Sequence, residues 1–187
     1  AKVSRMETFE YLRTLSKIKP SHKIPYLFMN LLEGGKHVVS GPAFQEYLAV
    51  STIDDIEEGV NAGIALHNAL EKIIKEKYGG NASVLGDEGG FAPKVKGNEE
   101  ALALLSEAVG TAGYKVGTDV VFALDIAASE LYSNGSYKLP VLKNEKERSA
   151  VNMIQWYQLL ASKYPIRSIE DGLAEDDWDG WKKMTTA

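Results

Sequence analysis

The hydrophobic positions of this sequence fall into two kinds of segment. Four short apolar runs, bounded by proline, glycine or charged residues, lie at residues 24–32, 44–50, 120–126 and 166–169. Runs of this length are typical of strands, and we expect the first to be buried on both faces. Longer segments with apolar residues at helical spacing lie at residues 3–17, 56–78, 98–109 and 147–163.

Turn and cap residues refine the expected elements. Thr52 to Asp55 resembles a capping box, and the apolar stripe of the helix that follows consists of Ile56, Val60, Ile64, His67, Leu70 and Ile74. We expect His67 to be a core histidine with a satisfied hydrogen bond. Asn134-Gly135 predicts a hairpin, and a last helix is expected to begin near Asp176 or Asp177. Strands alternate with helices in the second half, which predicts βαβ units, a parallel sheet and an α/β fold.

Composition excludes several classes of protein. Of 187 residues, 44% are hydrophobic, and 21 basic against 26 acidic residues give a net charge of −5. The apolar content argues against disorder, and the lack of a basic excess argues against nucleic acid as the main partner. The absence of cysteine excludes a disulfide scaffold and a cysteine nucleophile, and it is compatible with a cytoplasmic protein. No apolar run approaches the roughly 18 residues that a membrane span needs.

Acidic residues follow three of the expected strands. Asp125 lies at the end of one run, Glu170 and Asp171 follow another, and Ser83 to Leu85, a third expected strand, leads into the segment 86–90 (GDEGG). The C-terminal strand ends line the active sites of parallel α/β folds, so we expect these carboxylates to lie together. They would repel one another unless a cation or a proton lay among them, and oxygen ligands favour Mg²⁺ or Mn²⁺ over zinc.

Each of these features also has a purely structural interpretation. A strand-end acid often caps the next helix, and the segment 86–90 could form a tight acidic turn. Gln45 and Glu46 could lie on the solvated face of an edge strand, and His37 could lie in an exposed loop. Periodicity alone leaves both interpretations open.

Taken together, these segments resemble the enolase family. The matching stretches follow the family's order and spacing: Met29-Asn30 through Gly34-Gly35-Lys36-His37, Gln45-Glu46, GDEGGFAP at 86–93, Leu124-Asp125 with Ala128-Ser129-Glu130, and SIEDGL at 168–173 followed by Asp176-Asp177-Trp178. The resemblance implies an α/β fold in which residues 24–187 form the first half of an enolase-type (β/α)₈ TIM barrel. Residues 1–23 would then be the end of an N-terminal domain and its linker.

The resemblance also implies a reaction, the Mg²⁺-dependent and reversible dehydration of 2-phospho-D-glycerate to phosphoenolpyruvate in glycolysis and gluconeogenesis. Glu88 matches the general acid that helps the C3 hydroxyl leave. Glu46 matches the neighbouring carboxylate, which also contacts substrate, and a like charge nearby should raise the pKa of one member of this pair. Asp125 and Glu170 match two ligands of the first Mg²⁺, and Glu170 also contacts substrate.

Further roles follow from the same matches. His37 and Gln45 correspond to substrate-contacting residues, while Asp87 and Asp171 are expected to support the neighbouring site residues. The chain departs from the family where Glu33 replaces the usual Asn, and Val38, Val39 and Pro42 occupy a stretch in which small, flexible residues are common.

The family's third metal ligand, two lysines and a further histidine would lie beyond residue 187. We therefore expect a partial chain that is inactive by itself and belongs to a longer, dimeric enzyme. Two alternatives remain at this stage. One is a truncated, non-catalytic binding or structural module. The other is a different lyase or racemase of the enolase superfamily, against which GDEGGFAP argues, because that string resembles enolase proper.

Overall fold

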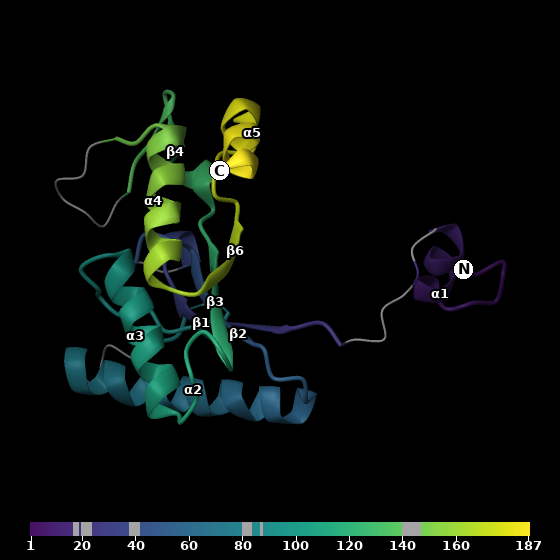
Figure 1. Ribbon diagram of the computed structural model, residues 1–187, viewed down its shortest axis with the longest axis horizontal. Helices are drawn as coiled ribbons and strands as arrows, with labels where there is room; N and C mark the ends of the chain where they lie inside the picture. Colours follow the sequence, from purple (N-terminus) through teal and green to yellow (C-terminus); the bar gives the residue numbers. More distant parts are fainter. Residues whose placement is uncertain (17–18, 20–23, 38–41, 80–83, 87, 140–146) are drawn as a thin grey trace.

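The computed structural model describes residues 1–187 except 17–18, 20–23, 38–41, 80–83, 87 and 140–146. Its elements follow one another along the chain as shown in Figure 1. They are α1 (Thr8–Leu15), β1 (Leu27–Glu33), the 3₁₀ turn η1 (Gly35–His37), β2 (Glu46–Ser51), α2 (Ile56–Tyr78), α3 (Asn98–Thr111), β3 (Val120–Asp125), the 3₁₀ turn η3 (Ala128–Leu131), β4 (Tyr132–Ser133), β5 (Ser136–Tyr137), α4 (Ala150–Lys163), β6 (Ile166–Glu170) and α5 (Trp178–Thr186).

One four-stranded sheet, in the order β1-β2-β3-β6, organises the fold. β3 and β6 are parallel and are joined through α4, which confirms the predicted βαβ unit. β2 is antiparallel to both β1 and β3. The connection from β2 to β3 contains two helices, α2 and α3, so the chain re-enters the sheet from the end where it left and reverses direction. The described strands form an open sheet, and the half-barrel and the two-domain division stay predictions.

The two faces of the sheet bury different residues. Side chains that alternate along the strands, such as Tyr47 and Phe122, join one large core with residues of α2, α3 and α4. The intervening side chains Val50, Val121 and Ala123 form a separate small cluster on the other face, with Leu48 packed against it. This alternation is the period of two that strands impose on their side chains.

The predicted apolar stripe of α2 is wrong in its first half. Ile56, Val60 and Ile64 are exposed, and the first turns instead bury Gly59, Ala62 and Gly63. A Cβ atom at Gly63 would lie 2.2 Å from the sulfur of Met29 on β1, so a larger residue there would have to displace the Met29 side chain. Helix and sheet therefore pack through small residues, which a search for large apolar side chains does not detect.

Two predicted strands also differ from the structure. β1 is not buried on both faces along its whole length, because Phe28 is 53% exposed near its start at the sheet edge. The expected strand at residues 83–85 is wrong in its described part, since Leu85 makes only an isolated bridge to Phe91.

Other local predictions hold. The hairpin of β4 and β5 turns at Asn134 and Gly135, whose φ angles are +51° and +84°. The last helix has Asp177 as its N-cap, and the Asp177 side chain accepts a hydrogen bond from the amide of Gly180.

The first helix is shorter than predicted, and none of the residues of α1, all of which the structure describes, is buried. Within the described ranges, no helix combines the length and apolarity that crossing a membrane requires.

Candidate active site

Four acidic residues form a row across one end of the sheet. Glu33 on β1 is the register partner of Glu46 on β2. Glu46 is also the partner of Asp125 on β3, and Asp125 is the partner of Glu170 on β6. Neighbouring strands lie about 4.8 Å apart, so the row is about 14 Å long at the backbone. Glu46 joins the row from the first position of its strand because β2 runs opposite to its neighbours.

Glu88 reaches this row from a tight turn. The amide of Gly86 donates to the carbonyl of Gly90 at 2.8 Å, and Gly89 adopts a φ of +88°, which favours glycine. Asn30 on β1 donates from Nδ2 to Oε2 of Glu88 at 3.3 Å. The Glu88 and Glu46 carboxyl groups share a hydrogen bond, which brings together the two residues expected to handle the proton.

The electrostatics of the row raise the pKa of two of its members, Glu46 and Glu170. Burial, followed by the charge of Glu88, raises the pKa of Glu46 from 4.5 to about 7, and Asp125 and Glu170 add smaller effects. Burial and the charge of Asp125 also raise the pKa of Glu170. One member of the Glu46–Glu88 pair thus has a raised pKa, as the sequence predicts, and the pair retains a proton close to neutral pH.

Asp125 is buried and oriented by two hydrogen bonds. It is 8% exposed, its Oδ1 accepts from the amide of Ala127 at 2.9 Å, and its Oδ2 accepts from Nε2 of Gln45 at 3.2 Å. The second bond places Gln45 beside the carboxylates, although it precedes the strand. β2 begins at Glu46, with Gln45 directly before it, so neither residue lies in the middle of the strand, as the run 44–50 had suggested.

The remaining predicted site residues lie around the row. Asp171 directly follows Glu170 and contributes to its raised pKa. The backbone of His37 ends η1, but its side chain lies outside the described part of the structure, as does the whole of Asp87. Lys36, next to His37, forms an ion pair with Glu130 that links η1 to η3. Both of those side chains are largely exposed, so this pair adds little stability.

Three residues that contact the Glu88 turn were not predicted to belong to the site. Glu33 is fully buried and accepts hydrogen bonds from that turn, Asn30 donates to Glu88, and His67 contacts the turn from α2. The available signal was the presence of two polar residues, Asn30 and Glu33, within an otherwise apolar strand.

The donor set of the row consists of carboxylate oxygens. Hard cations such as Mg²⁺ prefer these ligands, so the residues present fit such an ion. Within the described residues, no three acidic or histidine side chains converge closely enough to form a complete metal site. Asp125 and Glu170 would supply at most part of a ligand set.

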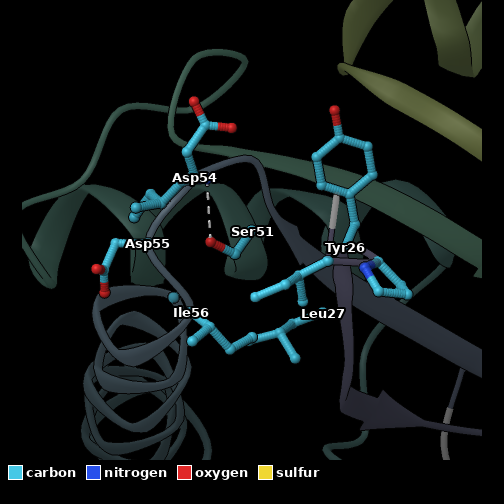
Figure 2. A pocket seen from close by; sticks show the side chains of 10 residues that line it. Tyr26, Leu27, Ser51, Asp54, Asp55 and Ile56 are labelled. Carbon is cyan, nitrogen blue, oxygen red and sulfur yellow. Dashed lines mark hydrogen bonds between the residues drawn. The ribbon is translucent and has the colours of Figure 1, made fainter. Parts of the chain in front are cut away.

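A cavity of about 590 Å³ lies at the opposite end of the sheet and is a poor candidate for the site (Figure 2). Its lining includes Leu27 and Ser51, which are register partners at the far end of β1 and β2. Ser51 follows Glu46 by five strand residues, or about 17 Å. Ile24, Tyr26 and Ile56 make the lining mainly apolar, and Ser51 Oγ accepts the amide of Ile53. In barrel-type α/β folds, the chemistry lies at the end where the acidic row is found here.

The mixed sheet, its covering helices and its acidic edge define a domain of the mixed α/β class. Residues 21–187 match the family described as "Enolase, C-terminal TIM barrel domain". Because this match covers most of the chain, the protein belongs to the enolase family.

Proposed function

We propose that the full-length protein is a phosphopyruvate hydratase, which reversibly dehydrates 2-phospho-D-glycerate to phosphoenolpyruvate with Mg²⁺. The observation that carries the proposal is the hydrogen-bonded Glu46–Glu88 pair beside Asp125 and Glu170. Two acids that share a proton near neutrality, next to further carboxyl groups, are suited to remove a hydroxyl group from an anionic substrate.

Glu88 would act as the general acid. The reaction breaks the C3–oxygen bond and the C2–hydrogen bond, and the departing hydroxyl takes up one proton to become water. Glu88 would donate that proton from its hydrogen bond with Glu46, whose pKa of about 7 makes the shared proton available at neutral pH. The base that removes the C2 proton is expected outside this chain.

Asp125 and Glu170 would hold Mg²⁺ through their carboxylate oxygens. Bound Mg²⁺ supplies positive charge that offsets the negative charge developing on the substrate carboxylate. The bonds from Ala127 and Gln45 keep the Asp125 carboxylate in one orientation, so its oxygens need little rearrangement to bind a cation. Gln45, Glu46, Glu170 and His37 would contact the substrate.

The proposal is tested by measuring Mg²⁺-dependent formation of phosphoenolpyruvate by the full-length protein. Glu88→Gln keeps the size of the side chain but removes the transferable proton, so kcat should fall by a factor of 10²–10⁴. Glu76→Gln, on the exposed side of α2, is a matched control and should keep full activity.

A loss of less than tenfold in Glu88→Gln would rule out the assigned role. Absence of turnover in the unaltered full-length protein would reject the hydratase. Turnover of a different carboxylic acid, with a hydroxyl group or a removable hydrogen on its α carbon, would then place the protein among other lyases or racemases of the superfamily. A protein that bound Mg²⁺ and phosphoenolpyruvate without any turnover would instead support a binding module.

A further inference from the structure

The Glu88 turn is held from the side of β1 by a buried carboxylate. Oε1 of Glu33 accepts hydrogen bonds from the backbone amides of Glu88 at 3.2 Å and Gly90 at 2.6 Å. Glu33 itself is 0% exposed. This single buried oxygen therefore holds the backbone on both sides of Gly89.

The same turn is held from the side of α2 by a histidine. Nε2 of His67 lies 3.2 Å from the carbonyl oxygen of Gly89. Because a carbonyl oxygen only accepts, Nε2 carries the hydrogen and donates it. The imidazole ring also lies against Phe91, with ring centroids 4.5 Å apart, so packing fixes its direction.

Packing and pairing leave the turn little freedom. A Cβ atom at Gly90 would lie 2.8 Å from Cγ of Glu33, so the backbone contacts the carboxylate side chain as closely as glycine allows. Just beyond the turn, the amide of Phe91 donates to the carbonyl of Leu31, and the amide of Glu33 donates to the carbonyl of Phe91. The turn is therefore attached to the outer edge of β1.

We infer that Glu33 and His67 are positioning residues that hold Glu88 against Glu46. Three backbone groups from three successive residues, the amide of Glu88, the carbonyl of Gly89 and the amide of Gly90, are bound by these two side chains from two different elements. We call this arrangement the 88–90 clamp. It rests on the proposed function in one respect only, that Glu88 is the acid whose position matters.

Substitutions at Glu33 and His67 can separate the loss of a hydrogen-bonding group from the loss of side-chain packing. Glu33→Gln keeps a carbonyl oxygen that can accept both amides, whereas Glu33→Ala removes the acceptor. His67→Phe keeps a ring against Phe91 but removes the donor to Gly89. Ser51→Ala serves as control, because Ser51 is also a buried polar residue, 2% exposed, at the opposite end of the sheet.

The first measurement is independent of catalysis. Amide hydrogen exchange, followed by mass spectrometry on a peptide covering residues 86–91 of the full-length protein, reports the bonds of the Glu88 and Gly90 amides. Exchange in this peptide should be at least tenfold faster in Glu33→Ala and at least threefold faster in His67→Phe. It should stay within twofold of the unaltered protein in Glu33→Gln and Ser51→Ala.

The second measurement is the separation of kcat from KM. Loss of positioning should lower kcat more than tenfold in Glu33→Ala with a change in KM of less than threefold, and Glu33→Gln should recover most of that loss. His67→Phe should lower kcat by three- to tenfold. A general loss of folding would instead accelerate exchange throughout the chain, which peptides from α3 and α4 would reveal.

Each outcome separates the clamp from the function. Unchanged exchange at 86–91 in both Glu33→Ala and His67→Phe overturns the clamp, whatever the activity. Faster exchange with unaltered kcat shows that the turn is held but that Glu88 does not depend on it, which also overturns the inference. If the unaltered protein lacks hydratase activity, the proposed function fails, while faster exchange in the same variants still supports the clamp.

Discussion

Glu46 and Asp125 are register partners on the antiparallel strands β2 and β3, so two carboxylates meet side by side at one end of the sheet. The charge of Asp125 is one of the causes of the raised pKa of Glu46, after burial and the charge of Glu88. Strand pairing thus contributes to the raised pKa of Glu46, together with burial and Glu88, and several measurable properties depend on this pKa.

Stability should depend on pH through Glu46. Because its folded-state pKa of about 7 lies above the ordinary 4.5, the native state binds this proton more tightly than the unfolded chain does. The stabilising contribution is complete below about pH 4.5 and is lost as the pH rises through 7. Glu46→Gln should therefore be more stable than the unaltered protein at pH 8, by about 1–2 kcal/mol after allowance for solvent screening.

Urea unfolding of the full-length protein at several pH values between 4.5 and 8, with a chelator present, measures this effect. Glu76→Gln should reproduce the slope of the unaltered protein. A Glu46→Gln variant with that same slope would contradict the raised pKa.

Divalent cations should stabilise the acidic row. Mg²⁺ should raise the midpoint of thermal unfolding, since binding to the native state alone shifts the equilibrium by mass action. Asp125→Asn removes one charge and should weaken Mg²⁺ binding at least tenfold by isothermal titration calorimetry. Its effect is compared with that of Glu130→Gln, an exposed acid paired with Lys36. Equal stabilisation by Na⁺ at matched ionic strength would show only screening.

The packing of α2 on β1 should not tolerate a larger side chain at Gly63. Gly63→Ala would place a Cβ 2.2 Å from the Met29 sulfur and should destabilise the fold by about 1–3 kcal/mol. Gly110→Ala, on α3, is the matched control, because its Cβ would meet no other described atom within 4 Å. That change should stabilise by about 0.5–1 kcal/mol, as expected for alanine in a helix. Chemical denaturation measures both, and the prediction fails if the two variants shift stability in the same direction.

Asn98, at the start of α3, should stabilise the segment that leads into β2 by accepting hydrogen bonds from it. Its Oδ1 accepts from the amide of Ala43 at 3.1 Å and from the hydroxyl of Tyr47 at 2.6 Å, and it is 2% exposed. Asn98→Ala leaves two buried donors without this acceptor and should cost about 2–4 kcal/mol of unfolding free energy. Tyr47→Phe removes one donor and should cost only about 1 kcal/mol, so comparable losses in the two variants would refute this account.

Local patterns predicted most elements, but they failed where packing depends on small residues or on distant parts of the chain. The apolar run at 120–126 gave the correct strand because every residue of β3 is buried. The run at 166–169 also gave a correct strand, although no residue of β6 is fully buried. The stripe through Ile56, Val60 and Ile64 predicted the wrong buried face of α2. Gly59 and Gly63 lie against the sheet instead, because without side chains they let the helix approach it closely.

The amino-acid sequence was enough to select the candidate site residues. Asp125, Glu170 and the GDEGG segment stand out because acids interrupt apolar runs, and the resemblance to enolases assigned Glu46, Gln45 and His37 to the same site. These are properties of residue identity and order, which need no knowledge of how the segments are placed in space.

The arrangement of those residues relative to one another came from the folded structure. Strand register aligned Glu33, Glu46, Asp125 and Glu170, and burial beside Glu88 raised the pKa of Glu46 to about 7. The same packing turned Glu33, a departure from the family in sequence, into the buried acceptor beneath the Glu88 turn. Proton affinity and positioning depend on distance and desolvation between segments far apart in the chain, and those quantities exist only once the chain has folded.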